Sequence, residues 1–228
     1  MIIVHHLNNS RSQRILWMLE ELGLKYEIKF HKRNPVSMLA PDSLKMVHPL
    51  GKAPILVDGP NTLVESGAIL EYLVDKYGGG KFRPVANSPE GLRYTFWMHF
   101  AEGSAMTPLL LSLVFARVAN PPVPLALKLM IAPVAKVIVA EVNRMIIAPN
   151  LKSHQKYMES ELSKSTWFAG EDFTAADVQM SFVVEASEAR GGLTKVSHPH
   201  LLAFLERIHA RPAYRRALEA GGPYRLKN

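Results

Sequence analysis

The residues best placed to bind a small ligand lie in one short stretch, residues 48–67, with the sequence HPLGKAPILVDGPNTLVESG. Ala53-Pro54 precedes an apolar run, and an X–Pro bond is the common site of a cis peptide, which exposes the backbone of the preceding residue to a ligand. Glu65-Ser66 opens a helical pattern, and we interpret Ser66 as its N-cap. The free N–H groups of a helix N-terminus attract a carboxylate, whereas Glu65 attracts an ammonium group. Together these groups suit an extended zwitterionic peptide.

The same stretch has a purely structural interpretation. Asp58-Gly59-Pro60-Asn61 is a turn sequence between two short apolar runs, which predicts a β-hairpin. In that interpretation Glu65-Ser66 only caps the following helix. Each feature alone favours the structural interpretation, but their combination in this order favours ligand binding.

The folded chain must bring these ligand-binding groups together, and the hydrophobic pattern predicts that it forms two domains. Alternation and helical spacing indicate the order β-α-β-α-β-β-α up to Tyr77, with the first four elements at 1–6, 12–22, 26–31 and 40–47. A parallel β-α-β unit joined to an antiparallel hairpin is the thioredoxin-like α/β arrangement. Gly78-Gly79-Gly80 ends the pattern, so we predict an N-terminal domain at 1–80.

The rest of the chain has a different pattern. Residues 81–88 are interpreted as a linker, and every long segment after Pro89 has helical spacing, which predicts an all-helical domain at 89–228. Pro108 is expected to kink or interrupt the first long helix. Thr174 and Asp177 have the spacing of a capping box, which predicts a helix start there.

These motifs together resemble a known family. Residues 48–67 closely resemble the glutathione-binding half of the glutathione S-transferases, with matches at Lys52, Ala53, Pro54, Glu65 and Ser66. The capping motif at 172–178 and the closing segment at 201–214 are similar to that family's C-terminal domain, so the resemblance covers essentially the whole chain. The segments 10–11, 48–51 and 100–104 look most similar to the yeast-type cytosolic subgroup and its bacterial relatives.

The resemblance implies glutathione as co-substrate, no further cofactor, and transfer of the glutathione thiolate to a small hydrophobic electrophile, a detoxification reaction. It implies that Lys52 pairs with the glycine carboxylate of glutathione, while His48 either assists there or simply packs before Pro49. Glu102 and Ser104 are assigned to the electrophile pocket, the alternative being an exposed polar helix face. The family also implies a homodimer in the cytoplasm.

A glutathione transferase must stabilise the thiolate, because a free thiol has a pKa of about 8.5. The family places Tyr, Ser, Cys or Asn in the loop after the first strand. This chain has no Tyr or Cys between Met1 and Gln13, which leaves Asn9, Ser10, Arg11 and Ser12. We choose Ser10 first, because it is closest to the serine position of the serine-type classes. Asn9 and Arg11 are close rivals. In the alternative interpretation, Ser10 is only an N-cap.

Two other functions use the same scaffold. One is a glutathione-dependent peroxidase or disulfide reductase, in which glutathione molecules exchange thiols because the chain has no cysteine. The other is a non-catalytic binding or regulatory protein, since fold does not determine function. The complete set of Lys52, Glu65 and Ser66 argues against a protein that has lost glutathione.

Composition excludes several further classes. The net charge of +7 is spread along the chain without a basic cluster, so we expect no nucleic-acid partner. The histidine pairs His5-His6 and His198/His200 lack the spacing of metal ligands, so we expect no metal. No stretch approaches the roughly 20 apolar residues that span a membrane, although peripheral membrane contact through residues 109–148 stays open.

Overall fold

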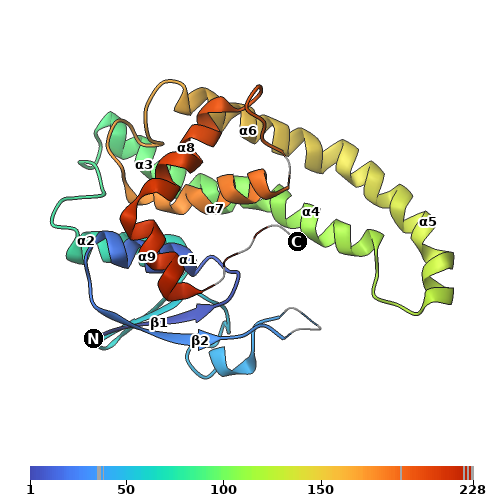
Figure 1. Ribbon diagram of the computed structural model, residues 1–228, viewed down its shortest axis with the longest axis horizontal. Helices are drawn as coiled ribbons and strands as arrows, with labels where there is room; N and C mark the ends of the chain where they lie inside the picture. Colours follow the sequence, from blue (N-terminus) through green and yellow to red (C-terminus); the bar gives the residue numbers. More distant parts are fainter. Residues whose placement is uncertain (35–36, 38, 191, 223, 225, 227–228) are drawn as a thin grey trace.

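The sheet and helices that carry the ligand-binding stretch are built from the first third of the chain. The computed structural model describes residues 1–34, 37, 39–190, 192–222, 224 and 226. In this third the elements are β1 (Ile2–Leu7), α1 (Gln13–Glu21), β2 (Tyr26–His31), a 3₁₀ turn (Asp42–Leu44), β3 (Ile55–Asp58), β4 (Asn61–Val64) and α2 (Ser66–Tyr77). Figure 1 shows this part at the lower left, with the helical part packed above it.

Strand pairing brings the predicted ligand-binding groups to one end of the sheet. β1 pairs in parallel with β2 and antiparallel with β3, and the strand order is β2-β1-β3-β4. His5, near the end of β1, pairs with Ile55 at the start of β3, and Ile55 pairs with Val64 at the end of β4. The loop after β1, the Ala53–Pro54 peptide and Glu65 therefore leave the sheet at the same end, which we call the binding end.

The thioredoxin-like fold class is confirmed, with one local correction. The helix predicted at 40–47 is only the 3₁₀ turn at Asp42–Leu44. Short helices are marginal because nucleation is costly, and this segment is confined between Pro41 and Pro49, which limits its length. A turn of this size still connects β2 to the binding end.

The second part is helical throughout its assigned elements, as predicted. These are α3 (Pro89–Phe100), α4 (Met106–Ala119), α5 (Leu125–Val142), α6 (Ala148–Leu162), α7 (Ala175–Ala189), α8 (Pro199–Ala210) and α9 (Pro212–Gly221). A π-helical turn at Ala101–Ala105 interrupts the first long helix, and α4 continues directly from it. Pro108 is the third residue of α4 and lacks the N–H that would bind the carbonyl of Ser104, so the interruption lies where Pro108 is expected to disturb the helix.

One hydrophobic core joins the two parts. Most of α7 is buried, and its residues share a cluster with side chains of α1, α2 and α3. The last helix returns to the first: Trp17 of α1 packs edge-to-face on Tyr214 of α9, and Arg211 donates to Glu21 at 2.6 Å. The position of the loop before α1 therefore depends on contacts with the end of the chain.

The capping box that starts α7 is present. The Asp177 carboxylate accepts from the backbone N–H groups of Thr174, at 2.8 Å, and Phe168, at 2.9 Å. Asp177 is fully buried, and burial raises its pKa to about 6 despite these N–H donors.

Asp177 is therefore expected to make stability depend on pH. Because its folded pKa of about 6 exceeds the ordinary value of 3.8, the neutral carboxyl favours folding below about pH 4. That contribution is lost as the pH rises through about 6. Urea unfolding of wild type and Asp177→Asn at several pH values measures the difference, which should fall over this window. Parallel pH profiles for the two proteins would contradict the assignment.

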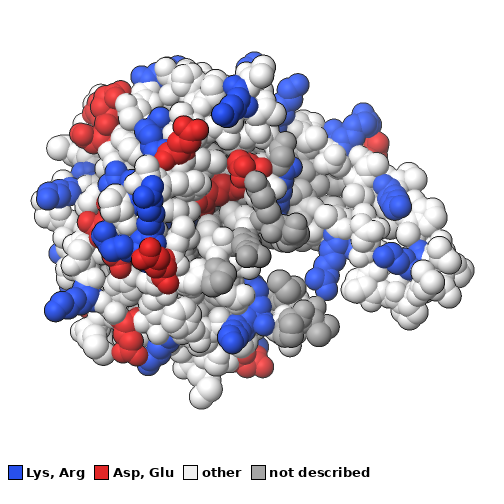
Figure 2. Space-filling model, viewed as in Figure 1, with Lys and Arg blue, Asp and Glu red and all other residues white. Residues whose placement is uncertain are grey.

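Helices α4 and α5 project from the rest of the molecule (Figure 1). None of the fully described residues of α5 is buried, and Leu129, Met130 and Val137 are each about 70% exposed. Residues 103–140 contain no Asp or Glu, and Figure 2 shows Lys and Arg scattered over this end. Among the described residues, no helix is both long and apolar enough to cross a membrane.

Candidate functional site

The loop between β1 and α1 holds the three candidates for thiolate stabilisation. Asn9 is exposed and has a positive φ of 48°, which asparagine tolerates. The Arg33 side chain donates to the backbone carbonyls of Asn8 and Asn9. Ser10 is buried, with its Oγ 2.6 Å from Ser12 Oγ. Ser12 directly precedes α1 but makes no side-chain cap bond, whereas Ser10 Oγ accepts from the backbone N–H of Ser12 at 3.2 Å. Ser10 therefore contributes to capping the helix start, and its role toward the thiolate stays a prediction.

Arg11 connects this loop to the helical part of the chain through an ion pair. Its guanidinium donates to Glu102 in the π-helical turn, and the second oxygen of Glu102 accepts from Arg14 at 2.7 Å. Arg14 is 2% exposed and also donates to the backbone carbonyl of Gln179 on α7, at 2.7 Å. Burial alone would raise the pKa of Glu102, but Arg14 and Arg11 lower it below the usual value.

Glu102 is bound by Arg11 and Arg14, one at each carboxylate oxygen. It is therefore not part of an exposed polar helix face, and its place in the electrophile pocket stays a prediction. Glu102 links α1 to the helical part of the chain. This ion pair lies next to the loop between β1 and α1, which we call the thiolate loop. Ser104 lies two residues further on in the same turn and is half-buried.

The other side of the binding end is formed by β3, β4 and α2. The Ala53–Pro54 peptide is cis, and Lys52 before it is exposed. Glu65 is exposed and has φ 69°, ψ 125°. A non-glycine residue in such a conformation often marks a functional position.

The N-cap assignment at α2 needs a correction. Glu65 is the N-cap residue, and Ser66 is the first residue of the helix and is buried. The positive φ of Glu65 turns the chain from β4 directly into α2, so the helix begins one residue earlier than predicted. The first N–H groups of α2 still have no partners within the helix, so the expected anion site is unchanged.

His48 shapes the loop that leads to Lys52. Its Nδ1 accepts from the backbone N–H of Leu50 at 3.3 Å, and its carbonyl accepts from Gly51 N–H at 2.9 Å. The ring is therefore partly engaged in its own turn, which agrees better with packing before Pro49 than with direct ligand contact.

The sequence patterns missed two residues of this region, His6 and Arg14, and left Ser12 among the loop candidates without choosing it. Alternation along β1 shows that His5 and His6 face opposite ways, but it does not show which histidine meets the loop. His6 Nδ1 lies 2.9 Å from Ser12 Oγ. Arg14 lies among apolar residues of α1, and its countercharge Glu102 is 88 residues away, so no local signal reveals the pair.

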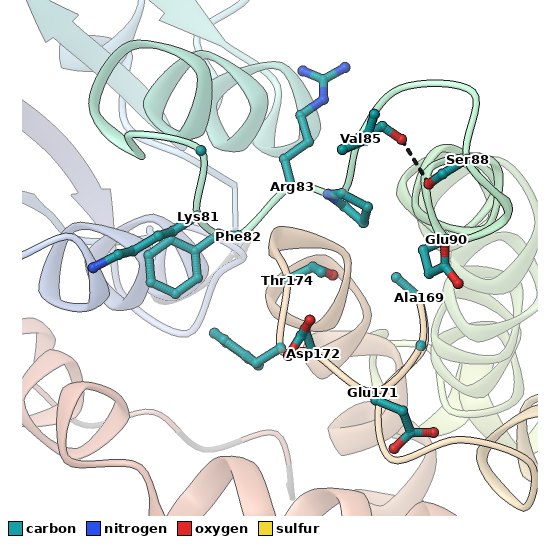
Figure 3. A pocket seen from close by; sticks show the side chains of 14 residues that line it. Lys81, Phe82, Arg83, Val85, Ser88, Glu90, Ala169, Glu171, Asp172 and Thr174 are labelled. Atoms are coloured by element: carbon teal, nitrogen blue, oxygen red, sulfur yellow. Dashed lines mark hydrogen bonds between the residues drawn. The ribbon is translucent and has the colours of Figure 1, made fainter.

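A cavity of about 680 Å³ lies elsewhere. It separates the linker at 80–85 from the loop at 169–174, and none of the predicted site residues lines it. Figure 3 shows the Arg83 guanidinium pointing away from this space, where it binds Asp75 at 2.6 Å. We therefore place the candidate site at the binding end rather than in the cavity.

Comparisons with known proteins agree with this arrangement. Residues 1–75 match the model of the glutathione S-transferase N-terminal domain, and residues 148–212 match that of the C-terminal domain. Glutathione S-transferase 3 of Schizosaccharomyces pombe is 39% identical over 96% of this chain and 87% of its own length. Glutathione S-transferase GstB of Escherichia coli is 27% identical over 96% and 98%.

A solved structure shows the same similarity. A glutathione S-transferase from Actinobacillus pleuropneumoniae superposes with a TM-score of 0.78 and 32% identity, covering 99% of this chain and 95% of its own. Yeast and bacterial relatives thus both occur among the matches, as the sequence motifs predicted. The chain belongs to the glutathione S-transferase family.

Proposed function

We propose that this protein is a glutathione transferase that joins the glutathione thiolate to a small hydrophobic electrophile. The observation that carries the proposal is the convergence of three groups at the binding end: the loop between β1 and α1, the backbone at Ala53 and Glu65 before α2. Strand register brings them together although they lie up to 56 residues apart in sequence, from Asn9 to Glu65.

Each end of the tripeptide has a matching group. Lys52 is exposed before the cis peptide and would pair with the glycine carboxylate. The exposed carboxylate of Glu65 would receive the ammonium group, and the N-terminus of α2 the neighbouring carboxylate. The backbone of Ala53 would hold the middle of the peptide. Such contacts position the sulfur near the loop that contains Ser10.

Glutathione binding and turnover test the proposal directly. Glutathione at a hundred times its Kd is expected to stabilise the fold by about 2.7 kcal/mol, seen as a rising melting temperature. A parallel panel of conjugation, peroxide and disulfide assays should show conjugation as the main activity. A melting temperature that millimolar glutathione leaves unchanged would favour the non-catalytic alternative, and dominant peroxide or disulfide turnover would favour the reductive one.

Ser10 is our proposed donor to the thiolate, with Arg11 and Asn9 as rivals. A hydrogen bond to a charged group contributes about 1.5–3 kcal/mol, and releasing the contact with Ser12 costs about 1 kcal/mol. Ser10→Ala should therefore raise the pKa of bound glutathione by roughly half a unit to one and a half units. Turnover at neutral pH should fall accordingly, with glutathione affinity little changed.

Thiolate absorbance of the glutathione complex, titrated against pH, measures this pKa. Asn9→Ala is the matched control in the same loop. An unchanged pKa in Ser10→Ala would remove Ser10 from the role, and a shift in Asn9→Ala or an Arg11 variant would assign it to that residue.

We further propose a homodimer for this chain. The exposed apolar side chains of α4 and α5 support it, because such a surface favours association and closed twofold pairs are the commonest assembly. The mass in solution distinguishes a dimer from the 25.4 kDa monomer.

A further inference from the structure

The hairpin of α4 and α5 projects from the molecule (Figure 1), and α5 packs against α4 along one side. The residues on that side are half-buried and recur every three or four positions, at Lys128, Ala132, Ala135, Val139 and Val142. All other positions of α5 are exposed. Most of the surface of this helix is therefore open to a partner outside the chain.

The exposed apolar side chains of α5 are not confined to one face. With 3.6 residues per turn, they fall into three groups that together span about two thirds of the helix circumference. Leu125 and Leu129 form one flank, Met130, Val134 and Val137 the outer face, and Leu127, Ile131 and Ile138 the other flank. A helix that packs on one protein partner typically presents a single apolar stripe. A second copy of the chain would therefore cover one group and leave the others in water.

The charges of this hairpin have one sign. Residues 103–140 contain Arg117, Lys128 and Lys136 but no Asp or Glu, so all 20 acidic residues of the chain lie elsewhere. The next carboxylate along the chain, Glu141, is bound by Arg144 at 2.6 Å. Figure 2 shows blue basic side chains among a mostly white surface at this end. An apolar helix with basic residues and no acidic ones is complementary to a bilayer with anionic headgroups.

We propose that the α4–α5 hairpin docks this protein on the surface of an anionic lipid bilayer, with the outer side of α5 immersed at the boundary between headgroups and acyl chains. Lipid surrounds an immersed helix on several faces at once, which fits the three exposed apolar groups of α5. Lys128 and Lys136 then extend their ammonium groups to the headgroups, while their stems contact the acyl chains. This docking is independent of the proposed transferase activity.

Co-sedimentation with lipid vesicles measures the docking. We expect the wild-type protein to bind phosphatidylcholine vesicles that contain about one third phosphatidylserine, and to bind pure phosphatidylcholine much more weakly. Met130→Glu with Val137→Glu places two carboxylates on the outer face and should abolish binding. The matched control is Val85→Glu with Val196→Glu, which makes the same charge change at exposed valines outside the hairpin. The control should bind as wild type does.

The two lysines test the electrostatic part of the docking. Lys128→Gln with Lys136→Gln should weaken binding to the anionic vesicles by about thirtyfold, because each cation near such a surface contributes a factor of about five. Lys25→Gln with Lys29→Gln removes the same charge from exposed positions in the first third of the chain and should change binding little. Equal binding of the wild-type protein to neutral and anionic vesicles would overturn the proposal of an anionic surface.

A fluorescent label shows directly whether α5 enters the lipid. The chain has no cysteine, so Met130→Cys and Val196→Cys each provide a single site for an environment-sensitive fluorophore. Emission from position 130 should shift to shorter wavelength when anionic vesicles are added, whereas emission from position 196 should not. This measurement leaves the rest of the chain unchanged, so it also decides the proposal if the glutamate variant does not fold. An unshifted label at position 130 on vesicle-bound protein would overturn it.

A second copy of the chain is the competing occupant of this face. Absence of vesicle binding by the wild-type protein would overturn the proposal. If Met130→Glu with Val137→Glu also converted a dimer to the 25.4 kDa monomer, the face would be an interface between copies. Vesicle binding that this variant retains would overturn the proposal as well. A melting temperature that glutathione does not raise would count only against the proposed function, because vesicle binding needs no glutathione.

Discussion

Replacing Glu102 by alanine is expected to lower the free energy of unfolding by about 3 kcal/mol. Removing one partner of a buried ion pair costs about 3–5 kcal/mol, because the other charge stays buried without compensation. Arg14 is that charge, at 2% exposure, and the Gln179 carbonyl would be its remaining hydrogen-bond acceptor among the described residues. Glu102 itself is 29% exposed, so water offsets part of the loss and the lower end of the range applies.

Urea unfolding of Glu102→Ala measures this effect, and Glu141→Ala is the matched control. Glu141 forms an exposed pair with Arg144 on the projecting end of the molecule, and such pairs contribute about 0–1 kcal/mol. A double variant, Glu102→Ala with Arg14→Met, should recover part of the stability because it removes the orphaned charge. Equal losses in Glu102→Ala and Glu141→Ala would contradict the assigned role.

Replacing Glu65 by alanine is expected to raise the KM for glutathione by roughly tenfold to a hundredfold with little change in kcat. A charge-assisted hydrogen bond to the substrate ammonium is worth about 1.5–3 kcal/mol. The ammonium lies far from the sulfur, so the contact is equal in ground and transition states, and its loss affects binding alone. Alanine at position 65 would adopt the same positive φ as Glu65, so the backbone strain is similar in both proteins. The substitution therefore removes only the carboxylate.

Steady-state kinetics with glutathione as the varied substrate test this expectation. Glu27→Ala is the control, because Glu27 is exposed on β2 at the opposite edge of the sheet from β4. It removes the same charge without touching the binding end and should leave KM unchanged. A fall in kcat at constant KM for Glu65→Ala would instead place Glu65 in the chemical step.

The sequence by itself determined the features that depend on neighbours in the chain. The period of apolar residues located the strands and most helices to within a few residues, because burial of one face imposes that period locally. The capping box of Thr174 and Asp177 was visible for the same reason, since its two residues are one helical turn apart. The glutathione stretch was visible because Lys52, Pro54 and Glu65 lie within one contiguous segment.

The tertiary structure decided what depends on residues far apart. Glu65 rather than Ser66 caps α2, because the positive φ of Glu65 sets the exit from β4. Glu102 binds Arg14 across 88 positions, and only the packing of the π-helical turn on α1 makes that pair. Arg211 binds Glu21 across 190 positions, because the last helix packs on the first. Burial and long-range contact set these charges and contacts, and neither leaves a periodic mark in a sequence.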